Sequence, residues 1–246
     1  MANRSDARVI LIAGPTASGK SALALALADE VGAEIVNADA LQVYRDLSVL
    51  SARPSASEEA RAPHHLFGHV DGSVRYSVGG WARDAAATLA SIAARGRPAI
   101  VVGGTGLYFR ALTEGLSEAP DIAPSVRAEA EARLAAIGLA AFRAEVIAAD
   151  PAMARLKPGD RQRHIRAWEV HRATGRPLAS FQTGGAPIID SPAARLILEP
   201  PRTDLYGAIE ARFDAMMAAG ALDEARTLAA RGLDPALPVM KAVGVT

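Results

Sequence analysis

The stretch Arg8–Ser21, RVILIAGPTASGKS, decides the fold of this chain of 246 residues. After Arg8, five apolar residues run to Ala13, and this run predicts a buried strand over 8–13. The following GPTASGKS matches the phosphate-loop pattern G-x-x-x-x-G-K-[ST]. Residues 20–31, KSALALALADEV, then predict a helix that ends at Gly32. A strand, a glycine-rich turn and a helix in this order give the context in which such a loop binds phosphate.

The loop brings together the groups that hold a phosphate or diphosphate. Its glycines let successive N–H groups wrap an anion, and the N-terminus of the following helix faces that anion. We expect Lys20 to reach the outer phosphate oxygens and the Ser21 hydroxyl to ligate Mg²⁺. A glycine-rich turn without a ligand is the alternative. The expected diphosphate-binding residues are Gly14, Pro15, Thr16, Ala17, Ser18, Gly19, Lys20 and Ser21.

The rest of the chain predicts an α/β fold, a P-loop NTPase-like parallel sheet flanked by helices. Further strands are expected at 34–38, 99–102 and 194–199, and further helices at 80–95, 203–219 and 221–231. Between 124 and 180 only helices are expected, at 124–137, 139–149 and 160–174. The pattern therefore predicts a discontinuous core, 1–120 with 186–246, interrupted by an all-α insertion at 121–185.

Composition excludes several classes of protein. The chain is 50% hydrophobic and 22% charged, which argues against disorder. It has no cysteine, which rules out disulfides, cysteine-based zinc sites and cysteine nucleophiles. The apolar run before Gly14 is too short for a signal peptide or a membrane span. We therefore expect a soluble cytoplasmic protein that does not bind membranes. Because the sequence has no clear oligomerisation signal, we also expect a monomer.

Positive charge is concentrated in one part of a chain whose formal net charge is zero. The segment 151–180 holds seven cations against two acids, a net charge of +5. An ordinary solvated helix face is one interpretation, and a surface that contacts a phosphate backbone is the other. The cations are Arg155, Lys157, Arg161, Arg163, Arg166, Arg172 and Arg176.

One acid is placed to act beside the phosphate loop. The apolar strand at 99–102 is followed by Gly103-Gly104-Thr105 and carries no acid, whereas Asp39 follows the strand at 34–38. Strand carboxyl ends line the ligand crevice in open α/β sheets, so Asp39 is expected to face the loop. Asp39 is then a general base or a metal-associated acid, unless it only caps the next segment.

Eight motifs in one order resemble the tRNA dimethylallyltransferase family, also called tRNA isopentenyltransferases. They are GPTASGKS, NADALQVYRDL, SARP, PHHL, GGTGLYFRAL, DRQRHIRAWEV, IEARFDAMMAAG and LPVMKAVG. The resemblance runs from about residue 8 to 244. The combination of the Asp39–Tyr44 and Gly103–Tyr108 segments with the phosphate loop is specific to this family. After KAVG the family continues with further helices, so the resemblance implies a chain that lacks the family's C-terminal part.

The resemblance implies transfer of a dimethylallyl group from its diphosphate to N6 of adenosine-37 in tRNA. It assigns general base catalysis to Asp39, places Thr105 close to the leaving group, and lets Arg212 contact the diphosphate together with Mg²⁺. From the residues alone, Arg212 would be a helix-surface arginine paired with Asp214 or Glu210.

The resemblance also implies contacts to the anticodon stem-loop of tRNA. One group of contacts falls inside the +5 segment, so charge and resemblance agree that the insertion meets RNA. The implied tRNA-binding residues are Asp39, Ala40, Leu41, Gln42, Gln162, Arg163, His164, Ile165, Arg166 and Lys241.

Three other functions compete with this one. The first is prenyl transfer to free AMP or ADP, which would not need a basic insertion. The second is a small-molecule P-loop kinase, which would need a pocket for a nucleotide base. The third is an RNA-binding remnant without catalysis.

Overall fold

The computed structural model describes residues 8–116, 122–181, 184–190, 192 and 194–245. The chain forms two compact units. The first consists of residues 1–113 and 187–246, and the second of residues 114–186. The expected insertion at 121–185 falls within the second unit. Among the described residues, no helix is both long enough and apolar enough to cross a bilayer.

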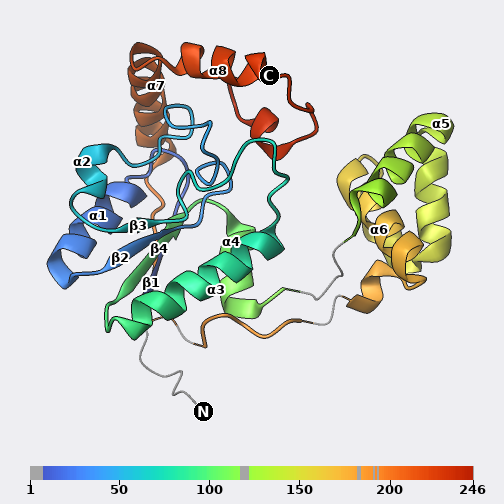
Figure 1. The fold of residues 1–246 in the computed structure, drawn as a ribbon, viewed down its shortest axis with the longest axis horizontal. Helices are drawn as coiled ribbons and strands as arrows, with labels where there is room; N and C mark the ends of the chain where they lie inside the picture. Colours follow the sequence, from blue (N-terminus) through green and yellow to red (C-terminus); the bar gives the residue numbers. More distant parts are fainter. Residues whose placement is uncertain (1–7, 117–121, 182–183, 191, 193, 246) are drawn as a thin grey trace. The chain divides into compact units, whose positions relative to one another are not determined.

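A five-stranded parallel sheet forms the centre of the first unit (Figure 1). Its spatial order is β3-β2-β4-β1-β5, with β1 and β4 in the interior. The phosphate-loop strand therefore lies between β4 and β5, as in the expected P-loop NTPase-like fold, which the structure confirms. The strands are β1 (Val9–Ala13), β2 (Glu34–Asn37), β3 (His64–His65), β4 (Ala99–Gly103) and β5 (Ala194–Ile197).

Helices cover both faces of this sheet. The connections from β1 to β2 and from β2 to β4 run in opposite directions across the sheet, so the right-handed rule for crossovers puts α1 (Lys20–Val31) and α3 (Val78–Ala94) on opposite faces. Strand side chains alternate accordingly: Ile12 and Ile100 pack with the small residues of α1, while Val36 and Val101 point the other way. The other helices of this unit are α2 (Ala56–Glu59), α4 (Gly106–Glu114), α7 (Arg202–Ala218), α8 (Ala221–Ala230) and the 3₁₀ turn η3 (Pro238–Lys241).

Four elements of the first unit were not predicted from the sequence: the four-residue helices α2 and η3, strand β3 and helix α4. The strand β3 has only two residues, too few to give a period-of-two pattern, and pairs with β2 through His64 and His65. Helix α4 follows the Gly103-Gly104-Thr105 turn directly, where turn residues dominate the sequence signal. Because all strands are parallel, β1, β2 and β4 end at the same edge of the sheet.

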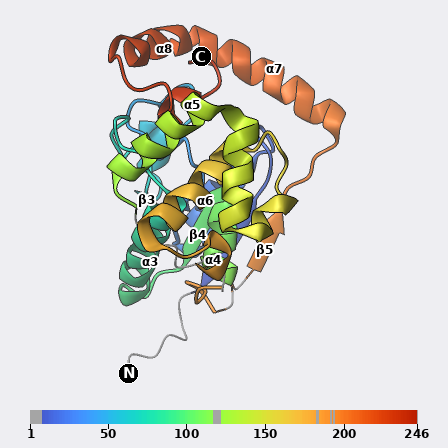
Figure 2. The same ribbon diagram turned by 90° about the vertical axis from the view of Figure 1, so that its right-hand side faces the viewer.

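In the residues of the second unit that the structure describes, every element is a helix (Figure 2). Its core forms where α5 packs against α6 and η1, around Phe142, Met153 and Ile165. Gly138 interrupts α5 with φ 77° and ψ 163°, so the expected break at this glycine is present. The elements are α5 (Pro124–Ala149), η1 (Pro151–Arg155), α6 (Arg161–Thr174) and η2 (Leu178–Phe181).

Candidate active site

Residues 14–19 join the end of β1 to the start of α1. Gly19 takes φ 82°, a left-handed conformation that glycine adopts without steric cost. No described side chain caps the start of α1, so its first N–H groups stay available to an anion. Gly14 is needed for another reason, because a Cβ there would lie 2.6 Å from Ser18 Oγ and 3.0 Å from the Leu198 carbonyl oxygen.

Lys20 is the first residue of α1 and folds back over the loop. Its Nζ donates a hydrogen bond to the Pro15 carbonyl at 3.1 Å. Burial lowers the pKa of Lys20, the charge of Asp39 opposes this shift, and the charge of Arg212 adds to it. The two charges that contribute to this shift, those of Asp39 and Arg212, both belong to predicted site residues.

The loop also contains an unpaired polar atom. Ser18 Oγ is buried and has no hydrogen-bond partner among the described residues. Buried hydroxyls normally have a partner, so this atom marks a hydrogen bond that the described residues do not supply. The neighbouring Ser21 is exposed on the first turn of α1. Pro15 and Thr16 are also exposed, and Ala17 takes a left-handed φ of 62°.

Asp39 lies two residues after β2 and is held by Asn37. Asn37 Oδ1 accepts from the Asp39 N–H at 2.8 Å, and Asn37 Nδ2 donates to the Asp39 carbonyl at 3.0 Å. Asp39 Oδ1 accepts from the Leu41 N–H at 3.0 Å. Oδ2 makes no hydrogen bond to the described residues and lies 3.7 Å from where a Cβ of residue 104 would stand. One carboxylate oxygen fixes the turn, and the other is available to a substrate.

The Gly103-Gly104-Thr105 turn brings the end of β4 against the Asp39 segment. A Cβ at Gly103 would lie 2.1 Å from the Ala38 carbonyl oxygen, so only glycine fits there. The Thr105 N–H donates to the Ala38 carbonyl at 3.1 Å, and Thr105 Oγ1 accepts from the Ala40 N–H at 2.9 Å. Thr105 therefore holds the peptides on both sides of Asp39, and its hydroxyl hydrogen stays available to a ligand.

The other predicted residues of the first unit differ in their exposure and in the polar groups that remain free to bind a ligand. Arg212 is half-buried on α7 and makes no ion pair with any described residue, so neither Asp214 nor Glu210 neutralises it. Gln42 Nε2 donates to the carbonyls of residues 51 and 52, which leaves only its Oε1 for recognition. Ala40 and Leu41 are half-buried. Lys241 is exposed at the end of η3, and no described contact connects it to the loop.

Several residues that support Asp39 were not predicted from the sequence. Trp81 Nε1 donates to the Asn37 carbonyl at 2.9 Å, and its ring stacks on Tyr108 at 4.1 Å between centroids. Burial raises the pKa of Tyr108, and Tyr44 and Asp39 add to the shift. The one available signal was Asn37, a polar residue at the end of a fully buried strand, since buried amides need partners.

Glu224 is a further supporting residue that was not predicted. Its carboxylate accepts from three backbone N–H groups, those of Ser48 at 2.8 Å, Val49 at 2.9 Å and Leu50 at 2.9 Å. Helix α8 is thereby attached to the segment that follows Asp39. No local sequence pattern predicts this contact, because about 175 residues separate its two partners.

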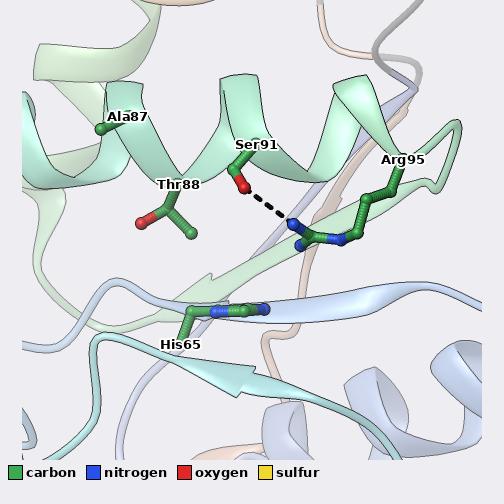
Figure 3. A pocket seen from close by; sticks show the side chains of 5 residues that line it. All are labelled: His65, Ala87, Thr88, Ser91 and Arg95. Carbon is green, nitrogen blue, oxygen red and sulfur yellow. Dashed lines mark hydrogen bonds between the residues drawn. The ribbon is translucent and has the colours of Figure 1, made fainter.

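A separate pocket with a volume of about 290 Å³ lies between α3 and β3 (Figure 3). Ser91 and Arg95 on the helix face His65 on the strand, and Ser91 accepts a hydrogen bond from Arg95 at 2.7 Å. Arg95 also forms a two-point ion pair with the buried carboxylate of Glu34. None of the predicted site residues lines this pocket.

In the second unit, the predicted RNA-binding residues divide into exposed and buried side chains. Gln162 and Arg163 are exposed on α6, and Arg166 is half-buried. His164 and Ile165 are 0% and 2% exposed, so their side chains lie in the core of this unit, and their assignment to tRNA binding stays a prediction. On an α-helix these two positions face α5 and join its core.

Acids within the second unit already pair with part of the +5 segment. Arg163 Nε lies 3.4 Å from Asp160, Arg166 Nη1 lies 3.7 Å from Glu169, and Arg172 Nε lies 3.3 Å from Glu129 of α5. The ordinary interpretation of this helix face is therefore partly correct. Lys157 and Arg161 are exposed and form no ion pair with the described residues.

Comparison with known families gives two matches that together span almost the whole chain. A family model described as IPP transferase matches residues 42–246. A second, described as Isopentenyl transferase, matches residues 7–64. The two matches overlap over residues 42–64, and the second one contains Asp39.

Curated relatives and solved structures carry related names. A tRNA dimethylallyltransferase of Phenylobacterium zucineum is 58% identical over 98% of this chain and 78% of its own length. One of Methylocella silvestris is 55% identical over 96% and 79%. A tRNA isopentenylpyrophosphate transferase structure from Bacillus halodurans gives a TM-score of 0.61 at 31% identity, covering 97% of this chain and 75% of that one. A eukaryotic dimethylallyltransferase acting on tRNA gives 0.76 at 27% identity, covering 93% and 58%.

Proposed function

The chain belongs to the IPP transferase family, the family of the tRNA dimethylallyltransferases, and from this premise we propose that it transfers a dimethylallyl group from dimethylallyl diphosphate to N6 of adenosine-37 in tRNA. The observation that carries the proposal is the free carboxylate oxygen of Asp39. It lies beside the phosphate loop, where the charges of Asp39 and Arg212 both contribute to the pKa of Lys20. A base and an anion site thus meet at one edge of the sheet.

The phosphate loop binds the diphosphate of the donor. The free N–H groups at the start of α1, the Lys20 ammonium and the Arg212 guanidinium all stabilise negative charge. That charge grows when the bond between C1 of the dimethylallyl group and the diphosphate oxygen breaks. Groups that are already in place for this charge lower the barrier without reorganising during the reaction.

Asp39 accepts the proton that the adenine amine loses. The N6 lone pair forms the new bond to C1, and one N6 hydrogen passes to Asp39 Oδ2 while diphosphate departs. Oδ1 cannot accept this proton equally well, because it already holds the Leu41 N–H. Asn37 and Thr105 fix the peptides around Asp39, so the base is oriented before the substrate arrives.

Mg²⁺ fits this site as a partner of the bound diphosphate. No three His, Asp or Glu side chains of the described residues gather in a metal site. The Ser21 hydroxyl is an oxygen ligand of the kind Mg²⁺ accepts, and diphosphate oxygens and water would supply the other ligands. Bound in this way, Mg²⁺ would neutralise the leaving group.

The second unit is the proposed tRNA-binding part, and the anticodon stem-loop is the proposed ligand. Gln162, Arg163, Lys157 and Arg161 present polar and cationic groups to solvent on or next to α6, which suits phosphate contacts. The target base has to leave its stack to reach Asp39 and the loop. The chain is proposed to act as a monomer, which sedimentation of the chain with and without tRNA would test.

One assay separates this function from its competitors. Purified chain with Mg²⁺ and ¹⁴C-labelled dimethylallyl diphosphate is offered tRNA, an anticodon hairpin, the same hairpin with guanosine at position 37, and AMP or ADP. Label is expected only in tRNA and the adenosine hairpin, and EDTA should abolish its incorporation. Labelled AMP or ADP would instead indicate a free-nucleotide prenyltransferase. RNA binding without incorporation would indicate a remnant, and phosphoryl transfer from labelled ATP a kinase.

A further inference from the structure

Neither the backbone conformation nor the packing at position 104 requires a glycine. The φ of Gly104 is not in the left-handed region, so another residue could adopt its conformation. A Cβ built on it would meet only two atoms within 4 Å, the Gly14 carbonyl oxygen at 3.6 Å and Asp39 Oδ2 at 3.7 Å. Both distances are ordinary van der Waals contacts, and Gly104 itself is exposed.

Neighbouring glycines differ from it. Gly103 is fixed by sterics, because a Cβ there would lie 2.1 Å from the Ala38 carbonyl oxygen. Gly106 begins α4 and faces open space, since a Cβ there would meet nothing within 4 Å. Of these three glycines, only Gly104 lies where an added Cβ would contact both the phosphate loop and Asp39.

The proposed reaction needs that position to be empty. With the diphosphate on the loop and the proton acceptor on Asp39, N6 and C1 have to meet between them. Reacting atoms have to approach to about 3–3.5 Å, and a misplacement of about 1 Å can cost about 100-fold in rate. A methyl group at residue 104 would enter the same space and push the reacting ends apart.

We infer that Gly104 is a steric determinant of the transfer step, because its missing side chain keeps open the space between the Gly14 carbonyl and Asp39 Oδ2 in which the allylic carbon and the acceptor amine meet. This inference rests on the proposed function. It also requires that Asp39 cannot simply turn away from an added methyl group. The hydrogen bond from the Leu41 N–H to Oδ1 holds the carboxylate against that movement. Asn37 accepts from the Asp39 N–H and donates to the Asp39 carbonyl, which fixes the backbone that carries the side chain.

The test compares Gly104→Ala and Gly104→Val with Gly106→Ala. Gly104→Ala should fold with an unchanged melting temperature and bind inorganic diphosphate like the wild type, because the loop and Lys20 are untouched. Its kcat for dimethylallyl transfer to tRNA should fall at least about tenfold, and Gly104→Val should fall further. Gly106→Ala, which adds the same methyl group two residues away, should keep wild-type kinetics.

Each outcome decides for or against the inference. It is overturned if Gly104→Ala has the kcat and KM of Gly106→Ala in an active enzyme. It is also overturned if Gly104→Ala loses diphosphate affinity in proportion to activity, because the residue would then act on the loop. If Gly104→Val does not fold, Gly104→Ala alone carries the comparison. A wild-type chain without transferase activity would overturn the proposed function, and that result precedes any comparison of variants.

Discussion

Lys20 is one of three lysines in a chain with 24 arginines. A compact ammonium on a flexible stem fits a position that a planar guanidinium would fill differently. At the start of α1 it is half-buried, and burial lowers its pKa because it removes water from the ammonium, while the charge of Asp39 opposes the shift. Such a site favours an anionic ligand. The ligand's negative charge stabilises the Lys20 ammonium in place of the water that burial removes.

Lys20→Ala is expected to raise the KM or Kd for dimethylallyl diphosphate by about 10- to 100-fold, the scale of a missing charge-assisted hydrogen bond. Isothermal titration with the diphosphate measures this effect directly. Lys157→Ala removes an exposed lysine of the second unit and should leave the same affinity unchanged. Equal affinities of the two variants would contradict the role of Lys20.

Asp39→Asn is expected to lower kcat by about 10²- to 10⁴-fold with little change in KM. The amide oxygen can still accept from Leu41, so the turn is kept. The amide nitrogen replaces Oδ2 and donates instead of accepting, so the proton acceptor is removed. Single-turnover rates with saturating tRNA measure the chemical step.

The matched control is Asp29→Asn, which removes an exposed carboxylate that pairs with Arg61 on the surface. It should have wild-type kcat. Loss of tRNA affinity in Asp39→Asn without a change in the chemical rate would make Asp39 a recognition residue instead of a base.

At the scale of elements, β2 carries a buried polar residue at each end. Glu34 begins the strand with its side chain 3% exposed, and Asn37 ends it. The Glu34 carboxylate accepts from Arg95 Nη2 at 2.6 Å and from His65 Nε2 at 2.7 Å, which joins β2 to α3 and β3. The hydrogen bond from Arg95 holds the pKa of Glu34 below its ordinary value, and burial opposes that shift.

Glu34→Gln is expected to lower the free energy of unfolding at pH 7 by about 1–3 kcal/mol, since Arg95 loses a buried charged partner. The folded pKa of Glu34 is depressed, so its contribution is complete above the unfolded pKa of about 4.3 and is lost as pH falls through the folded pKa. The difference between wild type and variant should therefore shrink from pH 7 to pH 3. Urea unfolding at both pH values measures it.

Glu59→Gln serves as the control, because Glu59 is an exposed glutamate on α2 without an ion pair to the described residues. Its unfolding free energy should follow the wild type at both pH values. A difference for Glu34→Gln that is equally large at pH 3 would mean that side-chain shape, not charge, is what Glu34 contributes.

At the scale of the whole molecule, the two units divide the proposed work. The first contains the phosphate loop and Asp39, and the second contains the cationic face of α6. Which arginines to test on that face depends on their partners. Arg166 pairs with Glu169, which is 3% exposed, so its removal would also disturb the core of the second unit. Arg161 and Arg163 are exposed, and their removal affects the surface alone.

The double variant Arg161→Ala with Arg163→Ala is expected to weaken tRNA binding. Its salt dependence should also become shallower, by about one unit for each tRNA phosphate that the variant no longer neutralises. Filter binding across a salt series measures both effects. Affinity for dimethylallyl diphosphate should not change, because the phosphate loop belongs to the other unit.

Arg133→Ala is the matched control, since Arg133 is an exposed arginine of the same unit that already pairs with Glu145. It should leave the salt series unchanged. Parallel lines of equal affinity for the double variant and the wild type would rule out an RNA-binding role for this face.

The sequence by itself determined the elements whose signals are local. The phosphate loop, the strands before and after it, the break at Gly138 and the helical composition of residues 124–174 all follow from neighbouring residues. Chain order then placed Asp39 near the loop, because parallel strands end at one edge of a sheet. These inferences needed only periodicity, turn chemistry and the common direction of parallel strands.

Only the tertiary structure decided how these pieces are held together. Asn37 binds Leu66 across 29 residues and Thr105 binds Ala40 across 65, so no local pattern contains either contact. The resemblance implied that His164 contacts tRNA, but packing within the second unit buries its side chain. In the sequence, Gly104 is one more turn glycine. Only the structure shows that a side chain at this position would contact both Gly14 and Asp39. Burial and long-range contacts depend on where distant segments meet, and that is fixed when the whole core packs.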